Sequence, residues 1–318
     1  MIRAHKILLY PNNKQETYFT KACGIARFAY NWGLSEWKEK FKAGEMVNEA
    51  KLRKALNAVK REKFPWMREV TKCVPQLAIK NDLNEAIMKF FEKKKGFPKF
   101  SKKGVNDSFS LSGIHFEIRE SKVWIPLLGW VKMAEELRFD GKITDATISK
   151  TAGKWYISIN VELPYTQAIN TEEDEGISAS SGGTSSIAVS DEVVVGLESI
   201  NDKLKKKQKR LSLELSRRQG PEEGETKSEN YKKTQRRYDR LQTRIENIRD
   251  NNTHQLSTRL AREYGVIRVK DADYRRTMSN RSMKRSAADE NYLRLRRQLE
   301  YKAAVTGARI VPYMDKKG

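Results

Sequence analysis

The sequence predicts an α+β multidomain protein, in which a small β-barrel is interrupted by a helical block and followed by an α/β region. Three observations predict it. Alternating, strand-like residues 2–9 precede a long stretch of helical periodicity, short β-rich runs fill residues 108–162, and strands alternate with helices after residue 176. With 318 residues, the chain is long enough for two or three domains that each bury a core.

The helical block is predicted from apolar residues that recur every three or four positions. The expected helices cover residues 14–40, 48–60 and 76–95. Pro75 suits the first turn of the last helix, and Gly96 ends it. Aromatic side chains at helical spacings, such as Trp32, Trp37 and Trp66, are more typical of a core than of base stacking. Residues 11–95 are therefore predicted to form one helical domain.

The barrel is predicted from short β-rich runs that are separated by glycines. The runs cover residues 108–112, 114–119, 122–127, 143–149 and 155–162. Several short strands at this spacing are typical of a small barrel. We expect the strand at residues 2–9 to join it, so that residues 1–10 and 96–165 form one domain. The helical block is then an insertion, and residues 165–175 form a linker.

The remaining residues, 172–318, are predicted to form an α/β domain. Its expected elements are strands at 176–180 and 186–195, a long helical hairpin with a loop at 219–229, a strand at 266–270, a helix at 289–305 and a strand at 309–313.

The charge of the chain favours a polyanionic partner. Lys and Arg number 63 against 41 Asp and Glu, which gives a net charge of +22 and a pI near 9.8. A basic but inert surface is the alternative. The sequence has no run of about 18 apolar residues and no apolar stretch after Met1, so we expect no membrane association and a cytoplasmic location in the bacterial nucleoid.

The cysteines and histidines do not predict a zinc site. Cys23 and Cys73 are expected to be buried free thiols rather than a disulfide. His5, His115 and His254 lie too far apart in sequence to suggest a zinc finger.

Basic residues gather in the hairpin and directly after the helical block. Those expected to contact RNA or heteroduplex phosphates are Lys205, Lys206, Lys207, Lys209, Arg210, Arg217, Arg218, Lys232, Lys233, Arg236, Arg237, Arg240, Arg244, Lys99, Lys102 and Lys103. A run of charge is also typical of a solvated helix face, and this alternative is expected to hold for about half of the hairpin residues.

Two expected strands carry residues that do not suit a metal-dependent nuclease. Two-metal sites hold their ions about 4 Å apart with carboxylates, because hard cations prefer anionic oxygen. Ser178 carries no charge, and the Lys270 ammonium repels cations. Asp271 follows Lys270 by one residue, so its side chain is expected on the opposite face of the strand. We therefore predict no metal site.

Six segments, in order, carry a resemblance to a known family. They are RFAYNWGL at 27–34, GFPKFSKK at 96–103, ATISKTAGKWYISINVELP at 146–164, the basic hairpin, NIRDNNTHQLSTRLAREY at 247–264 and LEYKAAVTGARIV at 299–311. Over nearly its whole length the chain resembles TnpB, the RNA-guided nuclease of bacterial insertion sequences and ancestor of the type V CRISPR effectors.

This resemblance implies an OB-like wedge barrel, an inserted helical recognition domain and an RNase H-like (RuvC) domain. In the family, an Asp stands at the position of Ser178 and a Glu at the position of Lys270. A third catalytic Asp and a zinc ribbon follow later in the family, so the chain is expected to be truncated at Gly318. These departures resemble TldR proteins, which are nuclease-dead TnpB derivatives.

The resemblance to TldR implies that the chain is not an enzyme and needs neither Mg²⁺ nor zinc. It implies instead a monomeric ribonucleoprotein, with an obligatory guide RNA, that binds double-stranded DNA and represses transcription at promoters. By position, Asn48, Gln76, Lys80 and Ser110 are the candidates for reading a short adjacent DNA motif. The alternatives are a residual metal-dependent RNA-guided endonuclease and a non-functional transposon remnant.

Overall fold

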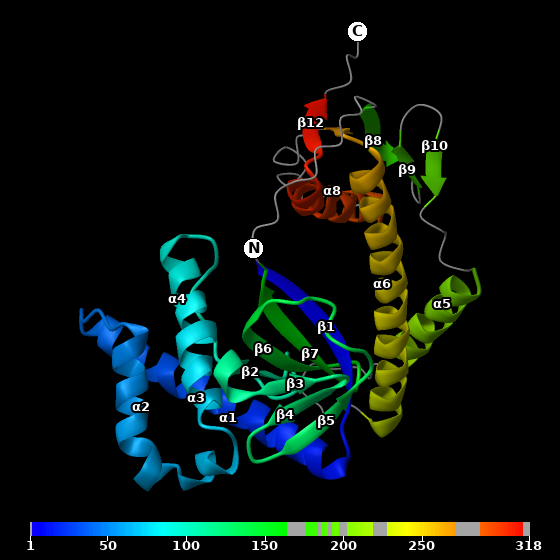
Figure 1. Ribbon diagram of the computed structural model, residues 1–318. Helices are drawn as coiled ribbons and strands as arrows, with labels where there is room; N and C mark the ends of the chain where they lie inside the picture. The colour runs from blue at the N-terminus through cyan, green and yellow to red at the C-terminus, as the bar shows by residue number, and fades with distance from the viewer. Residues whose placement is uncertain are drawn as a thin grey trace. The chain divides into compact units, whose positions relative to one another are not determined.

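The chain divides into two compact units, Met1–Pro164 and Tyr165–Gly318. The computed structural model (Figure 1) describes residues 2–163, 176–182, 186–189, 193–196, 202–218, 228–270 and 287–313.

The first unit begins with a strand, and its helices follow directly. The helices are α1 (Asn13–Lys42), α2 (Glu49–Lys63), α3 (Cys73–Leu77) and α4 (Asn84–Phe91), with a 3₁₀ turn at Pro65–Glu69 and a π-helical turn at Ala78–Leu83. A capping box fixes the start of α1, because the Gln15 N–H donates to Asn12 Oδ1 (2.9 Å) and the Asn12 N–H donates to Gln15 Oε1 (3.0 Å). The π-helical turn divides the helix that was predicted at residues 76–95.

One antiparallel sheet holds all the strands of the first unit. They are β1 (Ile2–Tyr10), β2 (Ser108–Ser112), β3 (Glu117–Arg119), β4 (Lys122–Ile125), β5 (Gly129–Met133), β6 (Lys142–Thr151) and β7 (Lys154–Glu162), in the order β2-β6-β7-β1-β5-β4-β3. The strand expected at 114–119 is shorter, because Gly113–His115 form a 3₁₀ turn. Strand β5 was not expected from the sequence.

Aromatic packing joins α1 to this sheet. Phe19 is fully buried, and its ring centroid lies 5.9 Å from that of Phe109 on β2 and 5.1 Å from that of Trp155 on β7. Trp37 is also buried and stacks on Phe41. Trp66 is 39% exposed, so the expectation of a core position is wrong for this residue.

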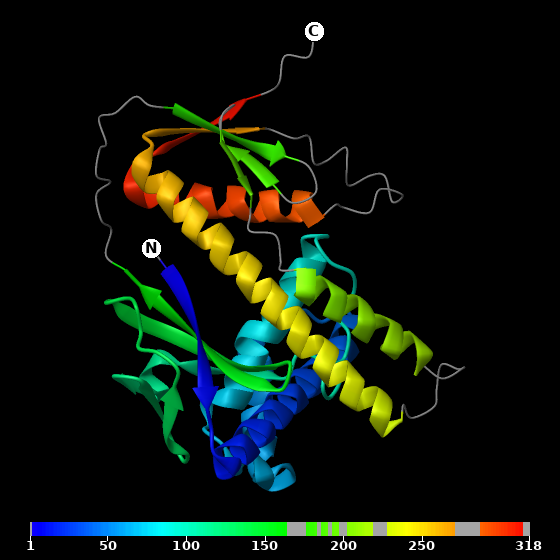
Figure 2. The ribbon, with the colours of Figure 1, turned by 90° about the vertical axis from the view of Figure 1, so that its right-hand side faces the viewer.

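The second unit contains a mixed five-stranded sheet. Its elements are β8 (Gly176–Gly182), β9 (Ser186–Val189), β10 (Val193–Gly196), α5 (Asp202–Arg217), α6 (Glu229–Glu263), β11 (Val266–Lys270), α8 (Ala287–Thr306) and β12 (Arg309–Tyr313). The strand order is β10-β9-β8-β11-β12, and β11 runs parallel to both of its neighbours. Helix α8 lies across one face of the sheet (Figure 2), where Leu295 and Leu299 pack against Leu260 of α6 and Ile267 of β11.

Gly113 is predicted to be essential for the stability of the first unit. A Cβ at this position would lie 2.5 Å from the Ile143 carbonyl oxygen and 2.9 Å from that of Thr144. Backbone atoms of β6 cannot yield as a flexible side chain would, so Gly113→Ala should lower the free energy of unfolding by about 1–3 kcal/mol. Gly96 is the control, since a Cβ there meets nothing within 4 Å. Equal urea midpoints for Gly113→Ala and Gly96→Ala would contradict this explanation.

The two thiols are predicted to be unreactive in the folded protein. Cys23 and Cys73 are free and buried, as the sequence predicted, and burial raises the pKa of both thiols, that of Cys23 to about 12. Because the thiolate is the nucleophile, a disulfide reagent at pH 8 should label neither cysteine until urea unfolds the chain. The absorbance of the released thiol product measures the labelling. Rapid labelling of the native protein would show that the core around α1 opens freely.

Candidate nucleic-acid interface

Helices α5 and α6 form a hairpin with a small core of its own. Leu211 of α5 packs with Leu241 and Ile245 of α6, and Leu204 and Tyr238 lie beside them. Gln208 Nε2 donates to Gln242 Oε1 at 3.1 Å across the same contact. This packing fixes which faces of both helices point outward.

Three of the basic residues expected to bind phosphates have acidic partners within the hairpin. Arg218 pairs with Glu214 at 2.9 Å and donates to the hydroxyl of buried Thr234 at 2.6 Å, so it joins the two arms. Lys205 pairs with Asp202 at 3.6 Å, and Lys232 with Glu229 at 2.7 Å. The hydrogen bond from Lys232 lowers the pKa of the Glu229 carboxyl. These cations are less available to a ligand than the sequence suggested.

Four other cations of α6 share one exposed face. Lys233, Arg237, Arg240 and Arg244, here called the α6 basic stripe, follow one another at intervals of four, three and four residues. The eleven helical steps from Lys233 to Arg244 extend about 17 Å, which matches several phosphate spacings of a nucleic-acid backbone. Within the described part of the chain, none of the four forms an ion pair. Like charges at this spacing repel, and a polyanion would relieve that repulsion.

Helix α5 presents a second, shorter set of exposed cations. Lys206, Arg210 and Arg217 lie on the side of α5 that faces away from Leu211. Lys207, Lys209 and, on α6, Arg236 are exposed as well. The sequence left open which of the basic hairpin residues only form a solvated face. The structure distinguishes the cations that have acidic partners, Lys205, Arg218 and Lys232, from the exposed cations named here.

The basic segment between α4 and β2 is held against α1 by its polar and aromatic residues. Asn31 Nδ2 donates to the Ser101 carbonyl (3.0 Å), and the Ser101 N–H donates to Asn31 Oδ1 (2.8 Å). The Lys38 ammonium lies 4.3 Å from the ring centroid of Phe100. The side chains of Lys99, Lys102 and Lys103 remain exposed.

The four candidates for reading an adjacent motif do not form one cluster. Asn48 caps α2, where its Oδ1 accepts the Lys51 N–H at 3.0 Å. The Ser110 hydroxyl lies 3.2 Å from that of Thr147 on the neighbouring strand.

Gln76 and Lys80 lie one helical turn apart and carry polar groups of the kind that read base edges. Gln76 Nε2 donates to Asn57 Oδ1 at 2.8 Å, and Lys80 follows four residues later with an exposed side chain. Asn57 is a partner that the sequence analysis missed, because only the fold brings α2 against α3.

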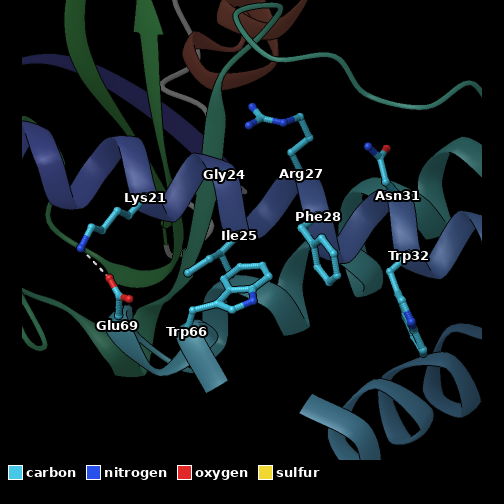
Figure 3. A pocket seen from close by; sticks show the side chains of 9 residues that line it. All are labelled: Lys21, Gly24, Ile25, Arg27, Phe28, Asn31, Trp32, Trp66 and Glu69. Atoms are coloured by element: carbon cyan, nitrogen blue, oxygen red, sulfur yellow. Dashed lines mark hydrogen bonds and ion pairs between the residues drawn. The ribbon is translucent and has the colours of Figure 1, made fainter. Parts of the chain in front are cut away.

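A groove of about 750 Å³ runs along α1 (Figure 3). Its lining residues are Lys21, Gly24, Ile25, Arg27, Phe28, Asn31, Trp32, Trp66 and Glu69. Lys21 pairs with Glu69 at 2.5 Å, and Arg27 pairs with Asp107 at 3.1 Å, so both cations are neutralised. The rings of Phe28 and Trp66 meet edge to face, with centroids 4.9 Å apart. The groove therefore offers aromatic surface, of the kind on which unpaired bases stack.

The two positions at which the resemblance to TnpB implies carboxylates lie on neighbouring strands. Ser178 is in β8 and pairs in register with Arg268 of β11, and Lys270 is the last residue of β11. The structure describes the backbone at both positions but not the side chains, and Asp271 lies outside the described residues. Among the side chains that are described, no group of three His, Cys, Asp or Glu could hold a metal ion.

No described helix is both long and apolar enough to cross a membrane.

Comparison with known sequences identifies the relatives of the chain. Residues 1–46 match a helix-turn-helix domain model, HTH_OrfB_IS605. The chain is 27% identical to the protein named "Putative RNA-guided DNA endonuclease InsQ" of Escherichia coli (strain K12), over 98% of this chain and 80% of that protein. It is 28% identical to a "Putative RNA-guided DNA endonuclease" of Streptomyces pristinaespiralis, over 97% of this chain and 76% of that protein.

These relatives correct one expectation from the sequence. We expected a protein that is not an enzyme, because Ser178 and Lys270 replace two carboxylates. Both relatives are named as endonucleases, so the comparison contradicts that expectation. The expectation depended on two residue types whose side chains the structure does not place, and the identity of a residue alone does not show how a site is built.

The fold of the chain is similar to that of a solved structure. A Cas12f1 solved in complex with a single guide RNA and target DNA superposes with a TM-score of 0.51 at 11% identity, over 94% of this chain and 73% of that one. The matched domain model and the two sequence relatives show that the chain is homologous to proteins named as putative RNA-guided DNA endonucleases, as the resemblance to TnpB predicted.

Proposed function

We propose that the chain binds a guide RNA and, through it, double-stranded DNA. In this division of work, base pairing reads the target, while the protein holds phosphates and reads a short adjacent motif. Bound at a promoter, the ribonucleoprotein excludes polymerase and represses transcription. We place it in the nucleoid as a monomer with one guide RNA. The observation that carries the proposal is the α6 basic stripe, which consists of four exposed cations without an acidic partner in the described residues.

We further infer an RNase H-like fold for the second unit and an OB-like wedge for the sheet of the first. The order β10-β9-β8-β11-β12, with an antiparallel meander on one side and two parallel strands on the other, supports the first assignment. The second is supported by the antiparallel sheet of seven strands into which α1–α4 are inserted.

RNA-guided cleavage of DNA is the second candidate function, and the names of both relatives favour it. One experiment separates the two. The RNA that copurifies with the protein is sequenced, and a duplex complementary to its guide segment, with a randomised flank and a promoter, is incubated with the ribonucleoprotein and Mg²⁺. Guide-dependent gel retardation with reduced transcription supports our proposal. Cut products at the target would establish the second function, and absence of guide-dependent binding would contradict both.

The α6 basic stripe should set the salt dependence of RNA binding. Changing Arg237 and Arg240 to Gln removes two phosphate contacts. The negative slope of the log of the RNA-binding constant against log salt should therefore become shallower by about 2. Filter binding across a salt series measures the slope. Lys232→Gln is the control on the same helix, because Lys232 already pairs with Glu229. A slope that the double variant leaves unchanged would mean that the stripe is only solvated.

Arg218 should act on the hairpin rather than on the ligand. Arg218→Ala breaks the bonds to Glu214 and Thr234 and should lower the stability of the α5–α6 contact, measured by amide hydrogen exchange in both helices. The salt slope for RNA should stay near that of the parent chain. A large loss of slope with unchanged exchange would instead make Arg218 a phosphate ligand.

A further inference from the structure

A second pocket in the first unit is separate from the α1 groove and from the hairpin. It has a volume of about 380 Å³, within the size range of small-ligand sites. Three segments that are distant in sequence build it: the end of α2 with the following turn and the start of α3, the 3₁₀ turn before β3, and the turn between β4 and β5. Its lining residues are Lys60, Arg61, Phe64, Met67, Arg68, Val70, Thr71, Lys72, Pro75, His115, Pro126 and Leu127.

The charged residues of this pocket are all cations. They are Lys60, Arg61, Arg68 and Lys72, and no carboxylate lines the pocket. In the described part of the chain none of the four forms an ion pair, although Lys21 and Arg27 of the neighbouring groove both do. Burial, followed by the charges of Arg61 and Lys72, lowers the pKa of the Lys60 ammonium. The cations therefore repel one another, and a bound anion would relieve this repulsion.

The floor of the pocket is apolar and rigid. Met67 and Val70 are buried, and the Phe64 ring is held by Phe28, with centroids 4.8 Å apart. Leu127 forms part of the rim, is 70% exposed and has a φ of 68°, in the left-handed region that a leucine rarely adopts. The pocket therefore offers apolar surface to a ring in addition to its cations.

One buried polar atom at the pocket lacks a hydrogen-bond partner within the described residues. It is His115 Nδ1. The Thr71 hydroxyl is already engaged, because it lies 2.7 Å from Tyr18 Oη and donates to the Pro126 carbonyl at 3.1 Å. His115 Nδ1 is itself shielded from solvent, so the polar contacts that the pocket offers to a ligand come from its cations.

We propose that this pocket binds a phosphorylated nucleoside. The cations would hold the phosphates, and the apolar floor would hold the base. The same chemistry is presented by a free nucleotide and by the phosphorylated end of a nucleic-acid strand. The site does not require the α6 basic stripe and goes beyond the guide-directed binding proposed above.

Calorimetry on the full chain tests the proposal with five probes: ATP, adenosine, inorganic triphosphate, and one short oligonucleotide with either a 5′-phosphate or a 5′-hydroxyl. Binding of ATP at least about tenfold tighter than of adenosine or triphosphate would support a site for both moieties and assign free nucleotide as the source. Binding of only the 5′-phosphorylated oligonucleotide would support it and assign a strand end. Failure of ATP and of both oligonucleotides to bind would overturn it, as would equal binding of the two oligonucleotides without ATP binding.

Matched variants locate the binding. The double variant Arg61→Gln, Lys72→Gln should bind the phosphorylated probe with an affinity at least about tenfold lower. Lys54→Gln, which changes an exposed lysine of the same helix outside the pocket, should have no effect. Equal affinities for the double variant and for Lys54→Gln would overturn the proposal, and thermal melting checks that each variant is folded.

The stripe variant separates this site from the proposed function. The double change of Arg237 and Arg240 to Gln should leave binding of the phosphorylated probe intact, while the pocket variant keeps the salt slope for guide RNA. Loss of probe binding in the stripe variant would place the ligand on α6 and overturn the assignment to this pocket.

Discussion

The pairing of β1 with β7 is the constraint on which the first unit depends. Eight consecutive residues pair, from Ile2 with Glu162 to Leu9 with Trp155, so the first strand of the unit lies beside its last. Because β2 begins only at Ser108, the helices between must leave the sheet and return to it. Phe19, set between Phe109 and Trp155, fixes α1 on the sheet. The α1 groove and the cationic pocket both lie on surfaces that this arrangement creates.

Periodicity predicted the elements whose pattern is local. The strand expected at 2–9, the hairpin and the strand at 266–270 are all present, because each carries a clear repeat of buried residues. Strand β5 was not expected, because it is defined by its pairing with β4 and β1 and not by a repeat in its own sequence. Ion pairs could not be predicted from the sequence either. Arg217 and Arg218 are neighbours of the same type, yet only Arg218 pairs with Glu214 in the fold.

The residue types at positions 178 and 270 led to a wrong expectation about enzymatic activity. Ser178 and Lys270 do lie on strands, as the sequence predicted, and the structure adds that these strands are adjacent and parallel; neither residue is a carboxylate. The inference that the chain is not an enzyme went further than these two substitutions allow, and the relatives named as endonucleases contradict it. The nucleic-acid account does not depend on that point, because holding phosphates requires cations and no metal chemistry.

A net charge of +22 becomes informative only when paired cations are separated from unpaired ones. The α6 basic stripe gathers four cations that have no ion pair among the described residues on one helix face, so the proposed binding of RNA depends on it most. Ultraviolet crosslinking of the ribonucleoprotein, followed by mass spectrometry, tests it directly. The account predicts copurifying RNA with crosslinked peptides that span residues 233–244. Recovery of protein free of RNA, or crosslinks confined to other segments, would contradict it.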